Sequence, residues 1–358
     1  MENGEVLISE TDAEMKGWPM KHTLTLLTVL LAALLVAPSA SAQENGKTRP
    51  SRPAARKAAK VLPAPPQPTL ANVPYGMHER HVLDFWQAES STPTPLAFVI
   101  HGGGWVGGEK ERVNRFVDVE QLLRAGISVA AINYRFIKHA EADGVKPPVK
   151  FPLHDAARGL QFVRSKAAEW NIDKPRIGAA GGSAGACSSL WLAFHDDLAD
   201  PQSDDPVGRE STRLWCAAVT GAQTTLDPQQ MKEWTPNSKY GGHAFGLGAF
   251  PQFLAGRDQI LPWIAEYSPY ALVSAGDPPV YLIYSAPPAL GQEQRDPTHT
   301  ANFGVKLQEH CTAQGVACEL VYPGAPGVKY ETPTDYLIAT LKASEHPAAE
   351  SPGGMNSR

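Results

Sequence analysis

The chain has 358 residues, of which 42% are hydrophobic and 19% charged, so it can bury a substantial core and is not disordered as a whole. Its formal net charge is −5, and no stretch alternates basic and aromatic residues, which argues against a nucleic-acid partner. An acidic or a neutral small ligand is compatible with this charge.

The first 42 residues predict an export signal. A short basic stretch at 20–22 precedes an apolar run at 23–36 and the small-residue cleavage site Ala40-Ser41-Ala42. The run is too short to span a membrane comfortably, so we expect an exported protein, periplasmic or extracellular, with no stable membrane insertion after signal removal. An amphipathic or anchoring helix is the alternative. Because residues 1–19 are acidic, translation from Met20 fits a signal better.

The next segments divide the chain. Residues 43–72 are rich in Pro, Ala, Lys and Arg without apolar periodicity, and they predict a flexible linker. Residues 346–358 predict a disordered tail. We therefore expect one domain over 73–345.

Within this domain, apolar runs alternate with helical patterns. Strands are predicted at 81–87, 96–100, 128–134, 176–180, 214–220, 280–284 and 318–322, and helices at 112–125, 153–170, 184–194, 302–314 and 333–343. This alternation predicts an α/β fold, with a mostly parallel central sheet covered by helices on both faces. Residues 224–269 do not follow this alternation of strands and helices. They predict an aromatic-rich insertion or cap near the site.

Two glycine-rich segments carry the chemistry. Gly181-Gly182-Ser183-Ala184-Gly185 follows an apolar run and precedes a helix, which is typical of a turn that exposes a serine nucleophile. His101-Gly102-Gly103-Gly104-Trp105 also follows a strand. The N–H groups of Gly103, Gly104 and Ala184 are candidates for stabilising a developing oxyanion. An ordinary buried serine is the alternative for Ser183.

Further residues strengthen this pattern. The glycine segment continues to Glu109-Lys110, Asn133-Tyr134-Arg135 follows a strand, and Arg176-Ile177-Gly178 leads to the serine turn. Together these motifs resemble the hormone-sensitive-lipase-like carboxylesterases, and most closely the bacterial feruloyl and acetylxylan esterases, over residues 95–345. The resemblance implies an α/β-hydrolase fold, Ser183 as nucleophile, an acid after the penultimate strand and a histidine after the last strand.

The candidates for the acid and the histidine lie on one loop, at Asp296 and His299. Asp296 follows the strand at 280–284 in the expected order, and a helix N-cap is its alternative role. The usual place of the histidine is empty, because residues 323–345 contain none and Tyr330 stands there instead. A phenol is a poor base at neutral pH. His299, on the same loop as Asp296, is our candidate base, and an ordinary loop histidine is the alternative.

Several other polar residues and the cysteines are expected to have structural roles. We expect His101 to brace the glycine loop and Asp155 to make a cap or structural contact. Cys187 and Cys216 are expected to be buried thiols, whereas Cys311 and Cys318 could form a local disulfide. No cysteine or histidine spacing indicates zinc, and no cofactor is expected.

Two functions follow from this pattern. The first is an exported serine carboxylesterase acting on small or medium esters, with acylated carbohydrates among the candidates. The second is a degenerate hydrolase fold that binds a small ester or sugar, or a partner, without turnover, and the missing terminal histidine favours this function. The intact serine turn and glycine loop favour the first, because strained segments are costly in a mere binder.

Overall fold

The computed structural model describes residues 64–344, so the predicted signal, the predicted tail and most of the predicted linker lie outside the described residues. Strand β1 (Leu70–Pro74) begins inside the predicted linker, and the linker prediction was wrong for these residues. β1 is an edge strand whose side chains are mostly exposed, so it carries no apolar pattern that could reveal it.

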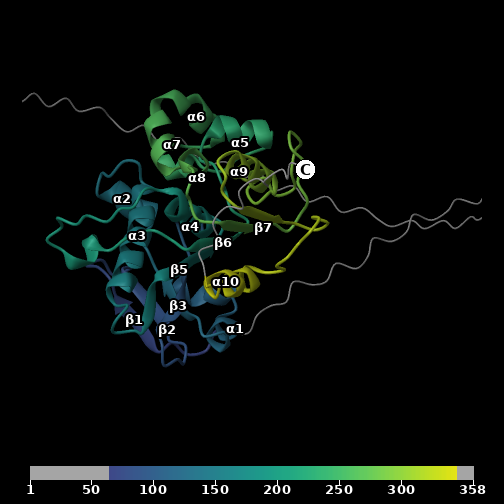
Figure 1. Cartoon of the computed structure of the whole chain (residues 1–358). Coiled ribbons are helices and arrows are strands. Elements are labelled where there is room, and N and C mark those ends of the chain that lie inside the picture. Colours follow the sequence, from purple (N-terminus) through teal and green to yellow (C-terminus); the bar gives the residue numbers. More distant parts are fainter. Residues whose placement is uncertain (1–63, 345–358) are drawn as a thin grey trace, which may run out of the picture. The chain divides into compact units, whose positions relative to one another are not determined.

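The described residues form one sheet of eight strands (Figure 1). The strands after β1 are β2 (Val82–Trp86), β3 (Thr94–Ile100), β4 (Ser128–Ile132), β5 (Ile172–Gly182), β6 (Cys216–Thr220), β7 (Val280–Ile283) and β8 (Cys318–Val321). Their order in the sheet is β1-β2-β4-β3-β5-β6-β7-β8. β2 pairs antiparallel with both β1 and β4, and all other pairs are parallel. The prediction of a mostly parallel sheet is confirmed.

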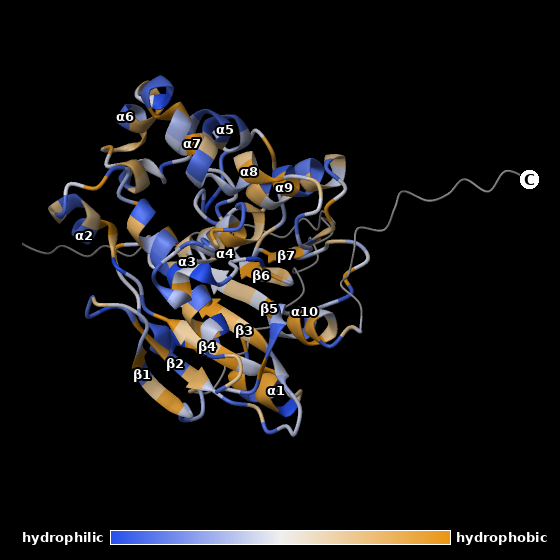
Figure 2. Cartoon of the chain, turned by 60° about the vertical axis from the view of Figure 1, so that its left-hand side comes forward, coloured by the Kyte–Doolittle hydropathy of each residue, from blue (hydrophilic) through white to orange (hydrophobic). Residues whose placement is uncertain are grey.

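Helices cover both faces of the sheet (Figure 1). On one face lie α2 (Ile137–Ala142), α3 (Lys150–Ser165), α4 (Ala184–Phe194) and α9 (Asn302–Ala313); on the other lie α1 (Val119–Arg124) and α10 (Pro333–Leu341). Alternate residues of β3 enter the two cores: Phe98 and Ile100 pack in the first, Ala97 and Val99 in the second. Figure 2 shows the central strands as mostly hydrophobic, as burial on both faces requires.

One predicted helix differs from the structure. The segment predicted as a helix over 112–125 is a 3-10 helix, η1 (Lys110–Arg115), followed by a break and then by α1. The break arises because Asp118 caps α1, accepting a hydrogen bond from the Gln121 N–H at 3.0 Å. Helix α1 therefore begins only after Asp118, and the residues before it form the separate helix η1.

The insertion predicted at 224–269 contains α5 (Pro228–Trp234), η3 (Gly242–Phe245), α6 (Phe250–Ala255), η4 (Arg257–Ile260) and α7 (Leu261–Tyr267), and α8 (Pro269–Leu272) follows. Figure 1 shows α5 to α8 gathered beyond the α4 face of the sheet. Their aromatic side chains pack together, as in the ring contact between Phe245 and Phe253 at 5.8 Å. No helix within residues 64–344 is long and apolar enough to cross a membrane.

Candidate active site

Ser183 lies in a strained turn between β5 and α4. Its backbone has φ 54° and ψ −122°, which a residue with a side chain rarely adopts and which costs about 1–3 kcal/mol. Glycines allow the turn to close: a Cβ on Gly181 would lie 2.6 Å from the Ile100 carbonyl oxygen and from the Gly185 backbone. The sequence pattern around Ser183 therefore produces the sharp strand-to-helix turn that it predicts.

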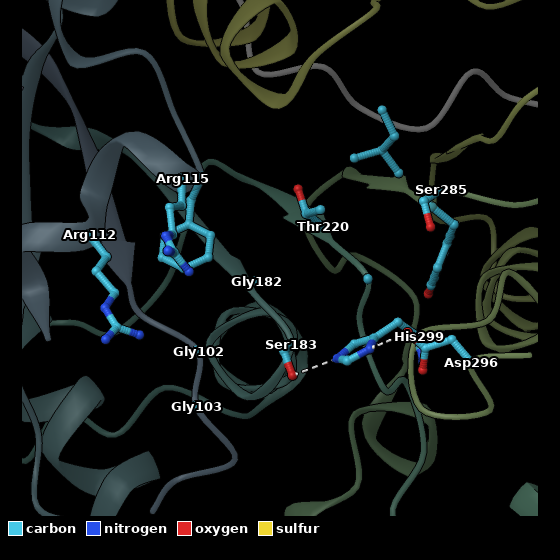
Figure 3. A pocket seen from close by; sticks show the side chains of 14 residues that line it. Gly102, Gly103, Arg112, Arg115, Gly182, Ser183, Thr220, Ser285, Asp296 and His299 are labelled. Atoms are coloured by element: carbon cyan, nitrogen blue, oxygen red, sulfur yellow. Dashed lines mark hydrogen bonds and ion pairs between the residues drawn. The ribbon is translucent and has the colours of Figure 1, made fainter. Parts of the chain in front are cut away.

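The structure brings Ser183, His299 and Asp296 together (Figure 3). His299 Nε2 lies 3.0 Å from Ser183 Oγ, and His299 Nδ1 lies 2.9 Å from Asp296 Oδ2. A carboxylate only accepts hydrogen bonds, so Nδ1 carries the proton and Nε2 accepts one from the serine hydroxyl. The distance of 3.0 Å between Ser183 Oγ and His299 Nε2 allows direct proton transfer between nucleophile and base, and the contact with Asp296 orients the imidazole.

Asp296 is held in its charged form. Partial burial alone would raise the pKa of its carboxyl group, but the hydrogen bond from His299 and the backbone N–H groups of Thr298 and His299 bring the pKa below its ordinary value. The carboxylate can therefore orient the imidazole at neutral pH. The alternative role of Asp296, the N-cap of the next helix, is not formed, because Ala301 is the N-cap residue of α9.

Two residues that the sequence did not single out hold His299 in place. The buried Gln223 side chain follows β6, and its amide donates to the Thr298 carbonyl at 2.7 Å and to the Gly221 carbonyl at 3.2 Å. Gly221 has φ +58°, and a Cβ there would contact the His299 side chain at 3.4 Å. Nothing in the sequence pattern marks a single glutamine for this role, because the contact joins segments 75 residues apart.

The glycine loop is braced as predicted. His101 is only 2% exposed, its Nδ1 lies 2.8 Å from the Gly102 carbonyl, and its ring stacks on Tyr134 with centroids 4.2 Å apart. Burial lowers the pKa of His101 to about 4, against the smaller opposing effect of that carbonyl. The imidazole is therefore neutral at pH 7, and the structural role predicted for His101 is confirmed.

The predicted oxyanion donors are placed unequally. Gly102 and Gly103 line the cavity beside Ser183, whereas Gly104 does not, and the Gly104 carbonyl lies 3.1 Å from His243 Nε2 of the insertion. Within residues 64–344, the N–H groups of Gly103 and Gly104 donate to no other backbone carbonyl. The Ala184 N–H begins α4 and lacks an intrahelical acceptor. Their roles as oxyanion donors remain predictions.

The cavity at Ser183 has a volume of about 500 Å³. It opens where the parallel strands end, at the carboxyl edge that commonly holds ligands in open α/β sheets. Its wall is formed by Gly102, Gly103, Arg112, Arg115, Phe116, Gly182, Ser183, Thr220, Gly221, Ile283, Tyr284, Ser285, Asp296 and His299. No residue of 224–269 lines this cavity, but His243 of the insertion lies 3.1 Å from the Gly104 carbonyl, so the insertion stands near the site, as predicted, beside the glycine loop.

Other candidates lie away from the cavity. Asp155 is buried in a contact with Arg135 and His81, which confirms its structural role. Tyr330 packs against the Tyr336 ring instead of facing Ser183.

All four cysteines are free thiols, so the suggested pairing of Cys311 with Cys318 is not made. No group of three or more His, Cys, Asp or Glu side chains among residues 64–344 could hold a metal ion.

Two known proteins that are similar to part of this chain are named as an esterase and a hydrolase. Versiconal hemiacetal acetate esterase of Dothistroma septosporum is 30% identical over 119 residues, covering 32% of each chain. An alpha/beta hydrolase of Acanthamoeba polyphaga mimivirus is 30% identical over 102 residues, covering 28% of this chain and 27% of that protein. The matched segments thus span about a third or less of these relatives.

A solved structure extends the comparison to the fold. Esterase 2 of Thermogutta terrifontis, phosphonylated by sarin, superimposes with a TM-score of 0.56 at 22% identity, covering 72% of this chain and 84% of that chain. The eight-stranded sheet described above is thus an α/β-hydrolase fold. A family model described as BD-FAE matches residues 83–287, more than half of the sequence. The protein therefore belongs to the BD-FAE family.

Proposed function

We propose that the protein is an exported serine carboxylesterase that hydrolyses small or medium esters. The observation that carries the proposal is the chain of hydrogen bonds from Ser183 Oγ through His299 to Asp296, at 3.0 and 2.9 Å. The names of the similar proteins support a hydrolase. The competing interpretation, a binding protein without turnover, rested on the missing histidine after β8, and His299 supplies an imidazole from the loop after β7 instead.

The geometry supports a two-step acyl transfer. Ser183 Oγ attacks the ester carbonyl carbon while His299 Nε2 takes the hydroxyl proton, and the Nδ1–H group stays bonded to Asp296. The N–H groups of Ala184 and Gly103 would stabilise the oxyanion. The imidazolium then protonates the leaving alcohol. Water, activated by the same imidazole, releases the acid and regenerates Ser183.

The nucleophile can be tested by covalent labelling. A fluorophosphonate probe should label the wild-type protein at Ser183, because within residues 64–344 this is the one hydroxyl of the cavity that is hydrogen-bonded to a histidine. Ser183→Ala should not be labelled, whereas Ser285→Ala, which removes another hydroxyl of the same cavity, should be labelled like the wild type. Mass spectrometry of the modified peptide gives the site. Equal labelling of wild type and Ser183→Ala would contradict the proposal.

Substrate size follows from the cavity. A volume of about 500 Å³ is in the range of small-ligand sites. We expect kcat/KM for nitrophenyl acetate or butyrate to exceed that for palmitate by at least about tenfold, the effect of roughly 1.4 kcal/mol. Initial rates on dispersed substrates measure this ratio. A preference for long acyl chains would contradict it.

Export and a carbohydrate substrate are also part of the proposal. Export rests on residues 20–42, and sequencing the amino terminus of exported protein should find it near Gln43; an intact Met20 would contradict this. Acylated carbohydrates are proposed from the motif resemblance to feruloyl and acetylxylan esterases. Release of acid from an acylated xylan tests that part, and an inert xylan with active nitrophenyl esters would overturn it.

A further inference from the structure

Two arginines stand in the wall of the catalytic cavity. Arg112 and Arg115 belong to η1 and line the same cavity as Ser183. Figure 3 shows both on one side of Ser183, with His299 and Asp296 on the other. The mechanism above uses neither side chain, and each carries a positive charge.

The nearby acidic residues do not neutralise these arginines. Glu109 pairs with Arg80 at 3.1 Å, and Glu111 pairs with Lys110 at 2.6 Å. Asp296 pairs with His299. Within residues 64–344, neither Arg112 nor Arg115 forms an ion pair or a side-chain hydrogen bond. The cavity thus carries two uncompensated positive charges in a chain whose net charge is −5.

The segment that carries the arginines is anchored. At its start, the buried Lys110 ammonium group lies 3.0 Å from Asp84 Oδ2, and the Lys110 N–H donates to the Asn133 side chain at 2.7 Å. Val113, which lies between the two arginines in the sequence, is buried in the core. At its end, Phe116 packs so closely on the serine turn that a Cβ on Gly182 would lie 2.5 Å from its ring. The backbone of this segment is therefore fixed before any ligand arrives, and both arginines stand in the wall of the cavity.

We propose that Arg112 and Arg115 form a subsite for a carboxylate group carried by the ester substrate. This inference rests on the proposed esterase function and narrows its substrate class to anionic esters. A guanidinium group stays charged at all physiological pH values and offers paired N–H donors that match the two oxygens of a carboxylate. Placed beside the nucleophile, the pair favours esters whose acyl or alcohol part bears a carboxylate.

The expected effect is moderate because both side chains are exposed to water. Hydrogen bonds to charged groups contribute more to the binding free energy than hydrogen bonds between neutral groups, but solvent screens the attraction at this site. We expect a preference of about tenfold in kcat/KM for a carboxylate ester over a neutral ester of the same shape, the fold-change that corresponds to roughly 1.4 kcal/mol. The preference should shrink as salt is added.

Two substrate pairs test the proposal. On the acyl side, mono-4-nitrophenyl adipate is compared with 4-nitrophenyl 6-oxoheptanoate, in which a methyl ketone replaces the carboxylate. On the alcohol side, 3-acetoxybenzoate is compared with its methyl ester. For wild-type protein we expect the ratio of kcat/KM, anionic over neutral, to reach about tenfold in at least one pair. A ratio near one in both pairs would overturn the subsite.

Variants separate the subsite from general electrostatics. Arg112→Gln combined with Arg115→Gln should bring the ratio to about one, because kcat/KM for the anionic ester falls more than kcat/KM for the neutral ester. Arg124→Gln is the control, because it removes a positive charge from α1, where Arg124 pairs with Glu120 on the surface. This variant should keep the wild-type ratio. A double variant that retains the ratio would also overturn the proposal.

A binding measurement keeps this inference distinct from the proposed function. The Ser183→Ala variant cannot form the acyl-enzyme, so calorimetry can compare its affinity for the anionic and the neutral ester of each pair. Tighter binding of the anionic ester, lost when Arg112 and Arg115 are also replaced, supports the subsite even if the wild type hydrolyses neither ester. Absence of turnover in the wild type contradicts the proposed function alone, and equal binding of both esters contradicts the subsite alone.

Discussion

Replacing His299 with alanine should lower kcat for ester hydrolysis by at least about 100-fold, the usual contribution of a positioned general base. His299 Nε2 is the hydrogen-bond partner of Ser183 Oγ, so the variant leaves the hydroxyl without an imidazole to take its proton. Some activity should persist, because an oxyanion site and substrate binding still accelerate the reaction. Single-turnover rates with a nitrophenyl ester measure the change in the chemical step.

Two further variants make this test specific. His310→Ala removes a histidine from α9 that stacks on Tyr270 with ring centroids 4.5 Å apart and does not line the cavity, so kcat should stay near the wild-type value. Tyr330→His restores a histidine where the family resemblance places it, and it should not rescue His299→Ala, since Tyr330 packs on Tyr336. Unchanged activity of His299→Ala, with a gain in Tyr330→His, would show that the base has been lost.

The sequence predicts the sheet and the nucleophile well because both depend on local patterns. Buried strands such as β3 are continuous apolar runs, and α4 begins directly after the serine turn, as the glycines around Ser183 indicate. β1 was missed because an exposed edge strand needs no apolar pattern. The break between η1 and α1 depends on the Asp118 cap, whose signal lies inside a segment that otherwise has helical spacing.

The remaining parts of the site depend on contacts between distant segments. His299 could be named only because the expected position was empty and Asp296 lay on the same loop. Gln223 fixes that loop from the end of β6, and no pattern in its neighbourhood indicates this. Arg112 and Arg115 were placed in an ordinary helix, where they would count as solvated surface charges. Their position in the cavity follows from the course of η1, which the sequence did not predict.

Replacing Asp155 with alanine should lower the free energy of unfolding at pH 7 by about 3 kcal/mol, the usual cost of breaking a buried ion pair. The Asp155 side chain is 3% exposed, and its carboxylate lies 2.6 Å from Arg135 Nη2 and 2.9 Å from His81 Nε2. The Arg135 backbone N–H also donates to it at 2.8 Å. Without the carboxylate, a largely buried guanidinium group loses its partner.

The same variant should impair catalysis indirectly. Arg135 directly follows Tyr134, whose hydroxyl donates to the His101 carbonyl at 2.8 Å and whose ring stacks on His101. Loss of the Asp155 contact should therefore loosen the glycine loop beside Ser183 and reduce kcat more than KM. Glu120→Ala, which removes an acid from an exposed pair with Arg124, should change stability by less than about 1 kcal/mol and leave kcat unchanged.

The pH dependence distinguishes an ionic contribution of Asp155 from simple loss of packing. Burial raises the pKa of this carboxyl group, but the contacts with His81 and with the Arg135 guanidinium group outweigh burial and place the pKa below its ordinary value. A carboxyl group with a lowered folded-state pKa stabilises the fold above its unfolded-state pKa of about 3.9, and this contribution is lost as pH falls through the folded-state pKa. Denaturant unfolding should thus show a difference between wild type and Asp155→Ala that is present at pH 5 and shrinks below about pH 4. A difference of the same size at every pH would mean that Asp155 acts through its shape and not through its charge.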